Sequence, residues 1–219
     1  AINRTSEGGW DIGVAAAGAE MSENAELCAD WPGLVEGMDL IGSTQVQGRA
    51  TLVGNLCNGS PAADSVPALI AAGATLTVTN ADGERSVNAE DVLTGPGRTS
   101  LNKGDVVSGV HIPARGKHGG DAYLRFIPRT EMDIAVVTLD GDTITSARVV
   151  LGAVAPTVVI VADAANAIIG STLDDAALNG LAKAAEAACN PIDDKRGTIA
   201  FRTEVAGVLA QRAAKIAYA

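Results

Sequence analysis

The residues best suited to bind a ligand lie between Ala50 and Asp64, in the run ATLVGNLCNGSPAAD. Two glycines, Gly54 and Gly59, would let the backbone approach a ligand closely, and exposed backbone N–H groups can cradle an anion. The neutral side-chain donors of the run are Thr51, Asn55, Asn58 and Ser60. Asp64 adds a carboxylate that suits a ribose diol. These residue types are compatible with a nucleotide-phosphate site or with a plain loop, but not with a core helix.

The rest of the sequence has no recognisable catalytic or metal-binding motif. Ser60 lacks the G-x-S-x-G context of a nucleophile elbow, and no P-loop, H-E-x-x-H or strand-linked G-x-G-x-x-G occurs. His111 and His118 have no Cys, Asp or His at ligand spacing. We therefore predict no catalytic acid–base pair and no metal site.

The three cysteines, Cys28, Cys57 and Cys189, are odd in number and widely spaced. Because no CxxC pair occurs, a zinc site or an iron–sulfur cluster held by this chain alone is not expected. We expect buried free thiols in a reducing compartment.

Composition limits the class of protein. The 219 residues suit one large domain or two small ones, and with 47 % apolar but only 3 % aromatic residues the core must be built from Ala, Val, Ile and Leu. The net charge of -10 argues against a nucleic-acid partner, because neutralising phosphates needs clustered Lys and Arg. No window has the ~18–20 uncharged apolar residues of a membrane helix, so we expect no transmembrane segment and a cytoplasmic location.

The first half mixes short strands and helices. A strand is predicted near Trp10, and a helix starting at Pro32 would place Leu34, Val35 and Met38 on one face. A second helix would start between Pro61 and Asp64 and stop at Gly73. Strand ATLTVT is followed by a hairpin turn with Asp82 and Gly83 in left-handed conformations, and DVVSGVHIP forms another strand.

The second half has strands first and helices later. AYLRFIPR, MDIAVVTL and TSARVVLGAV are strand-like, and Ala-rich helical runs cover 162–169, 174–189 and 203–218. This order predicts an α+β fold. We place a domain boundary in the loop ARGKHGG, giving domains 1–116 and 117–219.

The longer stretch STQVQGRATLVGNLCNGSPAADSVPAL resembles a flavin motif of the FAD-binding (medium) subunit of molybdenum hydroxylases. This is the family of aerobic carbon monoxide dehydrogenase and xanthine dehydrogenase, and its pattern is roughly Q-I-R-N-x-G-T-I-G-G-N followed by S-P-x-x-D. The residues in register are Gln45, Arg49, Thr51, Gly54, Asn55, Ser60, Pro61 and Asp64. Further family landmarks are GPGRTSLNKGDVVSGVHIP, AYLRFIPRTEMDIAVV, ARVVLGAVAPT and DDKRGTIAFRTEVAGVLAQRA.

The resemblance implies cofactor-binding roles in the first domain. Thr51, Gly54 and Asn55 would lie against the phosphates and ribityl chain of FAD, with Ser60 in the same motif. Asp64 would meet the adenosine ribose.

Four further positions are assigned by the same resemblance. Val107 would pack on the adenine, Arg125 would lie near the flavin, and Ile134 would lie over the isoalloxazine with Asp133 beside it. From their residue types alone, Val107 and Ile134 are also suitable core residues, and Arg125 could be a solvated strand charge.

Some positions depart from the family pattern. Gln47 stands where the family usually has Arg, Gly48 where it has Asn, and Ala50 where it has Gly. Val53 replaces the first glycine of the G-G pair, and a β-branched residue at positive φ is expected to crowd the phosphates or force a shift. The first part of the family's FAD domain, which carries a second glycine-rich loop, is expected to be absent.

The function implied by the resemblance is electron transfer by an oxidoreductase subunit in a hetero-oligomer. A molybdenum–pterin large subunit would oxidise the substrate, and a [2Fe-2S] iron–sulfur small subunit would pass electrons through FAD to a final acceptor. The alternative is a non-catalytic assembly subunit that has lost FAD. An unrelated sugar- or nucleotide-binding module is the third hypothesis.

Overall fold

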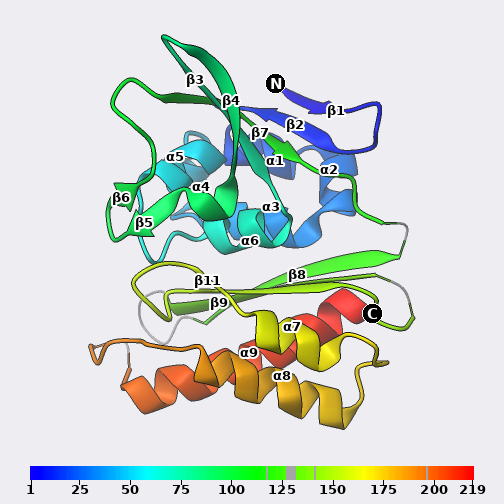
Figure 1. Ribbon diagram of the computed structural model, residues 1–219. Coiled ribbons are helices and arrows are strands. Elements are labelled where there is room, and N and C mark those ends of the chain that lie inside the picture. The colour runs from blue at the N-terminus through cyan, green and yellow to red at the C-terminus, as the bar shows by residue number, and fades with distance from the viewer. Residues whose placement is uncertain (117, 127–131, 141, 196) are drawn as a thin grey trace. The chain divides into compact units, whose positions relative to one another are not determined.

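The chain folds into two compact units, Ala1–Arg115 and Gly116–Ala219 (Figure 1). The structure is a computed structural model that describes residues 1–116, 118–126, 132–140, 142–195 and 197–219, with 132–140 described by their backbone. Each unit combines antiparallel sheet with helices, so the predicted α+β class is confirmed.

The first unit alternates short strands and short helices. Its strands are β1 (Ile2–Arg4), β2 (Trp10–Gly13), β3 (Thr75–Asn80), β4 (Gly83–Asn88), β5 (Leu93–Gly95), β6 (Arg98–Thr99) and β7 (Val106–Ile112). Its helices are α1 (Gly18–Ser22), α2 (Ala25–Asp30), α3 (Pro32–Asp39), α4 (Thr44–Gln47), α5 (Leu52–Cys57), α6 (Ser65–Ala71) and the 3₁₀ helix η1 (Ala89–Asp91).

A five-stranded sheet in the order β1-β2-β7-β3-β4 forms the centre of this unit. Alternate strand residues point to opposite faces, and one face supplies the core. The buried residues of that face include Trp10, Ile12, Leu76, Val78 and Val110. Helix α3 begins at Pro32 as predicted, and its Leu34, Val35 and Met38 are buried.

The β3–β4 hairpin forms as predicted, but its turn residues differ. Asn80 pairs with Gly83, so Ala81 and Asp82 make the two-residue turn. Gly83 has φ of 129°, whereas Asp82 is absent from the non-glycine residues with positive φ. The prediction of a left-handed Asp82 was therefore wrong, because the pairing register places the turn one residue earlier.

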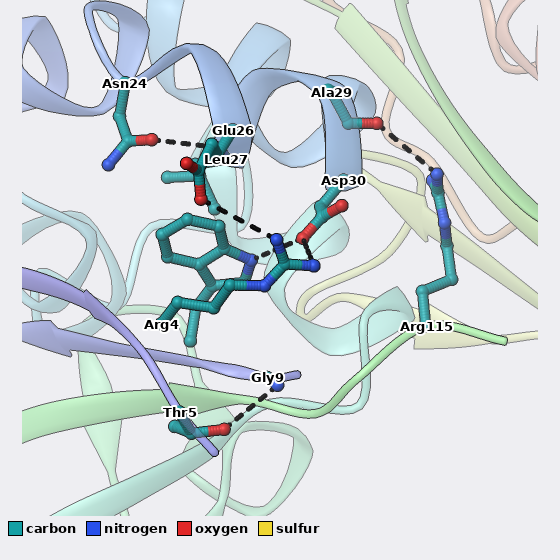
Figure 2. A network of polar contacts seen from close by, with 10 residues as sticks. Arg4, Thr5, Gly9, Asn24, Glu26, Leu27, Ala29, Asp30 and Arg115 are labelled. Atoms are coloured by element: carbon teal, nitrogen blue, oxygen red, sulfur yellow. Dashed lines mark hydrogen bonds and ion pairs between the residues drawn. The ribbon is translucent and has the colours of Figure 1, made fainter. Parts of the chain in front are cut away.

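A polar cluster ties β1 and β2 to helix α2 (Figure 2). Arg4 forms ion pairs with Glu26 at 3.6 Å and Asp30 at 3.1 Å. The indole N–H of Trp10 donates to Asp30 at 3.0 Å, and the Arg4 guanidinium lies 5.7 Å from the Trp10 ring centroid. Trp10 is therefore buried with its one polar atom satisfied, as an indole in a core requires.

The second unit begins with a sheet and ends with three helices. Its strands are β8 (Gly119–Phe126), β9 (Met132–Asp140), β10 (Ala147–Gly152) and β11 (Val159–Ile160), in the sheet order β11-β10-β9-β8. Its helices are α7 (Ala162–Ile168), α8 (Asp175–Ala187) and α9 (Ile199–Tyr218). Figure 1 shows the helices together on one face of this sheet.

Small side chains let these helices pack closely on the sheet. Ala210, Ala213 and Ala214 of α9 are fully buried with Val149 and Leu151 of β10. The helix starts are capped by side chains: Asp174 accepts from Ala177 N at 2.9 Å, and Thr198 accepts from Phe201 N at 3.2 Å. In the described part of the chain, no helix is both long and apolar enough to cross a membrane.

Candidate functional site

Helix α5 begins inside the glycine- and asparagine-rich run. Thr51 is its N-cap, and the Thr51 Oγ1 accepts a hydrogen bond from Gly54 N at 2.9 Å. The exclusion of a core helix from these residues was wrong, because Leu52, Val53 and Leu56 bury one face of a short helix. Among the contacts of residues 1–116, none engages the N–H groups of Leu52 and Val53, as usual for a first helical turn.

The Val53 side chain is buried within the first unit. It lies within α5, is 7 % exposed, and is not among the residues with positive φ. The expected positive φ at Val53 was therefore wrong, because Val53 has helical backbone geometry and packs its side chain in the first unit.

Gly59 packs closely against the backbone of Gly97. Its φ is 68°, its carbonyl accepts from Gly97 N at 2.8 Å, and a Cβ at this position would lie 3.0 Å from Gly97 Cα. The close approach that the sequence suggested for Gly59 is therefore to the β5–β6 turn.

Asn55 links α5 to α6. Its Oδ1 accepts from Ser65 N at 3.1 Å and from Ser65 Oγ at 2.8 Å, and Ser65 is fully buried. The structure thereby brings the predicted residues around Thr51 and Asn55 together with those around Asp64.

Ser60 and Asp64 lie in the connection between these helices and at the start of α6. Ser60 Oγ accepts from Ala62 N at 3.2 Å, which fixes a local turn. Asp64 is 6 % exposed and occupies the N-cap position of α6, but its side chain makes no cap hydrogen bond. Asp64 is the one buried carboxylate near α5 and α6 in the described chain.

Val107 lies on the core face of β7. It is 4 % exposed and pairs with Val78 of β3, while its neighbour Val106 is 62 % exposed on the other face. Helix α5 contacts β7, so Val107 belongs to the same unit as the motif residues.

The remaining predicted residues lie in the second unit. Arg125 on β8 pairs in register with Ile134 on β9, and Asp133 is the preceding residue of β9. The structure therefore brings Arg125 and Ile134 together in one sheet, separately from the residues of the first unit.

One polar pair was missed by the sequence analysis. His111 Nδ1 lies 2.8 Å from Asp11 Oδ1, across the pairing of β7 with β2. Both residues line a hollow of about 290 Å³ on the outer face of the sheet. The two residues are 100 positions apart, so no local spacing indicates this pair.

The cysteines are free, but the expectation that they are all buried was wrong. Cys57 is exposed on α5, whereas Cys28 and Cys189 are half-buried. Over the residues that the structure describes, no group of three or more His, Cys, Asp or Glu side chains could hold a metal ion.

The comparisons with known proteins agree with this geometry. Residues 1–115 match the family model described as the FAD binding domain in molybdopterin dehydrogenase. The chain belongs to this family. Residues 122–217 match the CO dehydrogenase flavoprotein C-terminal domain. The predicted resemblance to the FAD-binding medium subunit of molybdenum hydroxylases is thus confirmed.

Individual relatives of this FAD-binding family are similar over most of the chain. The carbon monoxide dehydrogenase medium chain of Afipia carboxidovorans is 31 % identical over 198 residues, covering 88 % of this chain and 69 % of the relative. A putative xanthine dehydrogenase FAD-binding subunit of Escherichia coli is 29 % identical, covering 71 % and 56 %. The solved carbon monoxide dehydrogenase of Hydrogenophaga pseudoflava matches with a TM-score of 0.94 and 28 % identity, covering 100 % and 77 %.

The chemistry of the α5 region fits FAD. A pyrophosphate is an acceptor of hydrogen bonds, and the region offers backbone N–H groups at a helix start together with the Thr51 hydroxyl and the Asn55 amide. Asp64 supplies a carboxylate, which accepts hydrogen bonds from a ribose diol.

Proposed function

We propose that this chain is the electron-transferring flavoprotein subunit of a molybdenum hydroxylase. Bound FAD would supply the redox chemistry, receiving electrons from [2Fe-2S] clusters and passing them to a final acceptor. The protein's own residues would bind and orient the cofactor. This role needs no acid–base pair in the chain.

The match of residues 1–115 to the FAD-binding family is the single observation that supports the proposal most strongly. Within the matched region, the N–H groups of Leu52 and Val53 have no partner among residues 1–116 and are available to a hydrogen-bond acceptor. Thr51 keeps its hydroxyl hydrogen for a ligand while its oxygen caps the helix. We assign Thr51, Gly54 and Asn55 to the pyrophosphate and ribityl chain, with Ser60 shaping the following turn.

Three other parts of FAD are assigned to other residues. Asp64 would accept hydrogen bonds from the ribose, and Val107 would provide apolar contact to the adenine. Arg125, Asp133 and Ile134 of the second unit would lie near the isoalloxazine.

The rival hypothesis of an assembly subunit without FAD is not proposed. It rested in part on Val53 obstructing the phosphates, and Val53 is a buried residue of α5. The match to an FAD-binding family over residues 1–115 also argues against that hypothesis.

We further propose that the chain works in a complex. The relative from Afipia carboxidovorans is a medium chain, which implies other chains beside it. The expected partners are an iron–sulfur small subunit and a molybdenum–pterin large subunit, assembled in the cytoplasm.

Affinity purification of the tagged chain from its native cells tests the proposal. We expect two further subunits, one containing iron and sulfide and one containing molybdenum, together with a flavin spectrum that bleaches when substrate is added. Recovery of the chain by itself, colourless and without these metals, would contradict the proposal.

A further inference from the structure

Ser65 is a fully buried polar residue at the first position of α6. A buried hydroxyl without a hydrogen-bond partner is costly. Ser65 avoids this cost, because its hydroxyl and its backbone N–H both donate to the same acceptor atom. Its N–H and its Oγ–H donate to Asn55 Oδ1, at 3.1 and 2.8 Å. The two residues are ten positions apart, so this contact fixes α5 against α6.

These two bonds also determine which way the Asn55 amide faces. A backbone N–H can only donate, so the atom that faces Ser65 must be the oxygen of Asn55. The Nδ2 group then points away from Ser65, because the two amide substituents diverge from one carbon. None of the contacts within residues 1–116 engages Nδ2, and Asn55 is half-buried rather than enclosed.

The start of α6 shows why this contact matters locally. An aspartate before a helix normally caps it, yet Asp64 has helical backbone angles and its side chain makes no cap hydrogen bond. Asn55 accepts from the first N–H of α6 instead. Asn55 therefore caps α6 from ten residues away, and Asp64 is the residue that directly precedes the capped Ser65.

We infer that Ser65 is a positioning residue of the FAD site, acting through Asn55. It holds Oδ1, so that the Asn55 amide presents two N–H donors to the pyrophosphate. The inference rests on the proposed function. Without the Ser65 hydroxyl, only the Ser65 N–H would hold Oδ1, and the side-chain amide would be less restrained about its broad terminal torsion.

The test is a double-mutant cycle in FAD affinity, measured by flavin fluorescence on the chain purified with its partners. We expect Ser65→Ala to weaken FAD about 3- to 10-fold, the usual range for one neutral hydrogen bond. In an Asn55→Ala background, Ser65→Ala should have no further effect. Equal weakening in both backgrounds, or no weakening in either, would overturn the inference.

The variant Asn55→Asp distinguishes the role of the amide oxygen from the role of the amide nitrogen. An aspartate keeps an oxygen that accepts from Ser65, so the thermal midpoint should change little. It replaces the outward donors with a second oxygen, so FAD affinity should fall more than about 10-fold. Loss of thermal stability with unchanged FAD affinity would overturn the assignment.

Ser22→Ala is the matched control. The Ser22 hydroxyl lies in the same unit, donating to Gly18 O at 3.0 Å and to Asp39, and neither of these contacts involves a residue of α5 or α6. It should lower stability without changing FAD affinity.

Failure of the unsubstituted protein to bind FAD would overturn the proposed function itself. The same double-mutant cycle measured by urea unfolding distinguishes this case, because it reports the coupling of Ser65 and Asn55 without a ligand.

Discussion

Asp64 is the residue whose charge we expect FAD to need most. It is 6 % exposed, so a hydrogen bond from a ribose hydroxyl to its carboxylate would be formed largely out of water. Hydrogen bonds to a charged group contribute about 1.5–3 kcal/mol, so Asp64→Asn should weaken FAD about 10- to 150-fold. Titration of FAD followed by fluorescence measures this change.

Asp82→Asn is the control for this prediction, since Asp82 is exposed in the β3–β4 turn. It should leave the affinity for FAD unchanged. An Asp64→Asn protein that binds FAD like the unsubstituted protein would remove Asp64 from the site.

Val53 should matter for stability and not for the cofactor. Its buried side chain faces the core from α5, so Val53→Ala should lower the free energy of unfolding by about 2 kcal/mol through lost burial and a residual cavity. Urea unfolding followed by tryptophan fluorescence reports this, because Trp10 and Trp31 are both buried in the first unit. A change in FAD affinity without a change in stability would show that Val53 touches the ligand.

At the scale of elements, a polar network fastens the β3–β4 hairpin to the start of β7. Asp105 accepts from Arg85 at 3.0 and 2.5 Å, from Asn102 N at 2.8 Å and from Asn80 Nδ2 at 2.9 Å. The Arg85 hydrogen bonds first, and then the Asn102 N–H, hold the pKa of Asp105 well below its usual range. The Asp105 side chain is only 1 % exposed, although it does not belong to the apolar core, because its hydrogen-bonding partners surround it.

This shift gives a pH dependence with a definite sign. Because the folded pKa lies below the unfolded one, ionised Asp105 stabilises the fold above its ordinary pKa, about pH 4. The stabilisation is lost as the pH falls through the folded pKa. The difference in urea midpoint between the unsubstituted protein and Asp105→Asn should therefore shrink below about pH 4; a difference that stays constant down to pH 2 would refute this role of Asp105.

Arg202 fastens two loops of the second unit to α9. It is 5 % exposed and donates to Ile192 O at 2.9 Å and Ala153 O at 2.5 Å, with Asp194 at 3.8 Å. Arg202→Met should destabilise this unit by about 1–3 kcal/mol, because it leaves carbonyls without their donors. Thermal unfolding followed by circular dichroism measures the loss, with the exposed Arg212→Met on the same helix as control; equal midpoints for the two variants would contradict the role.

The elements that sequence reasoning found are those with a local signal. Helix α8 has a capping aspartate and strand β7 alternates buried and exposed residues, whereas α9 was predicted from residue 203 and begins at Ile199, behind the N-cap Thr198. Helix α5 was missed because Gly54 and Asn55 are poor helix formers. Its apolar spacing at Leu52, Val53 and Leu56, behind the N-cap Thr51, was the signal that could have found it.

Contacts between distant parts of the chain were not predictable in this way. The pairs Asp11–His111 and Asn55–Ser65 depend on strand register and helix packing, which local patterns do not determine. The site residues came from a family resemblance, and the structure adds which of their atoms already have partners.

At the scale of the whole molecule, the candidate residues are divided between the two units. The first unit contributes the α5 and α6 residues and Val107, and the second contributes Arg125, Asp133 and Ile134. We therefore expect substitutions at the α5 and α6 residues to be testable within the first unit alone.

A comparison of FAD with riboflavin tests whether the start of α5 holds the pyrophosphate. Riboflavin has the same ring system but no phosphate and no adenosine. We expect the purified complex to bind FAD at one per chain and riboflavin at least about 100-fold more weakly, since several hydrogen bonds of about 0.5–1.5 kcal/mol each are lost. Equal affinities for the two flavins, or no binding of FAD, would contradict it.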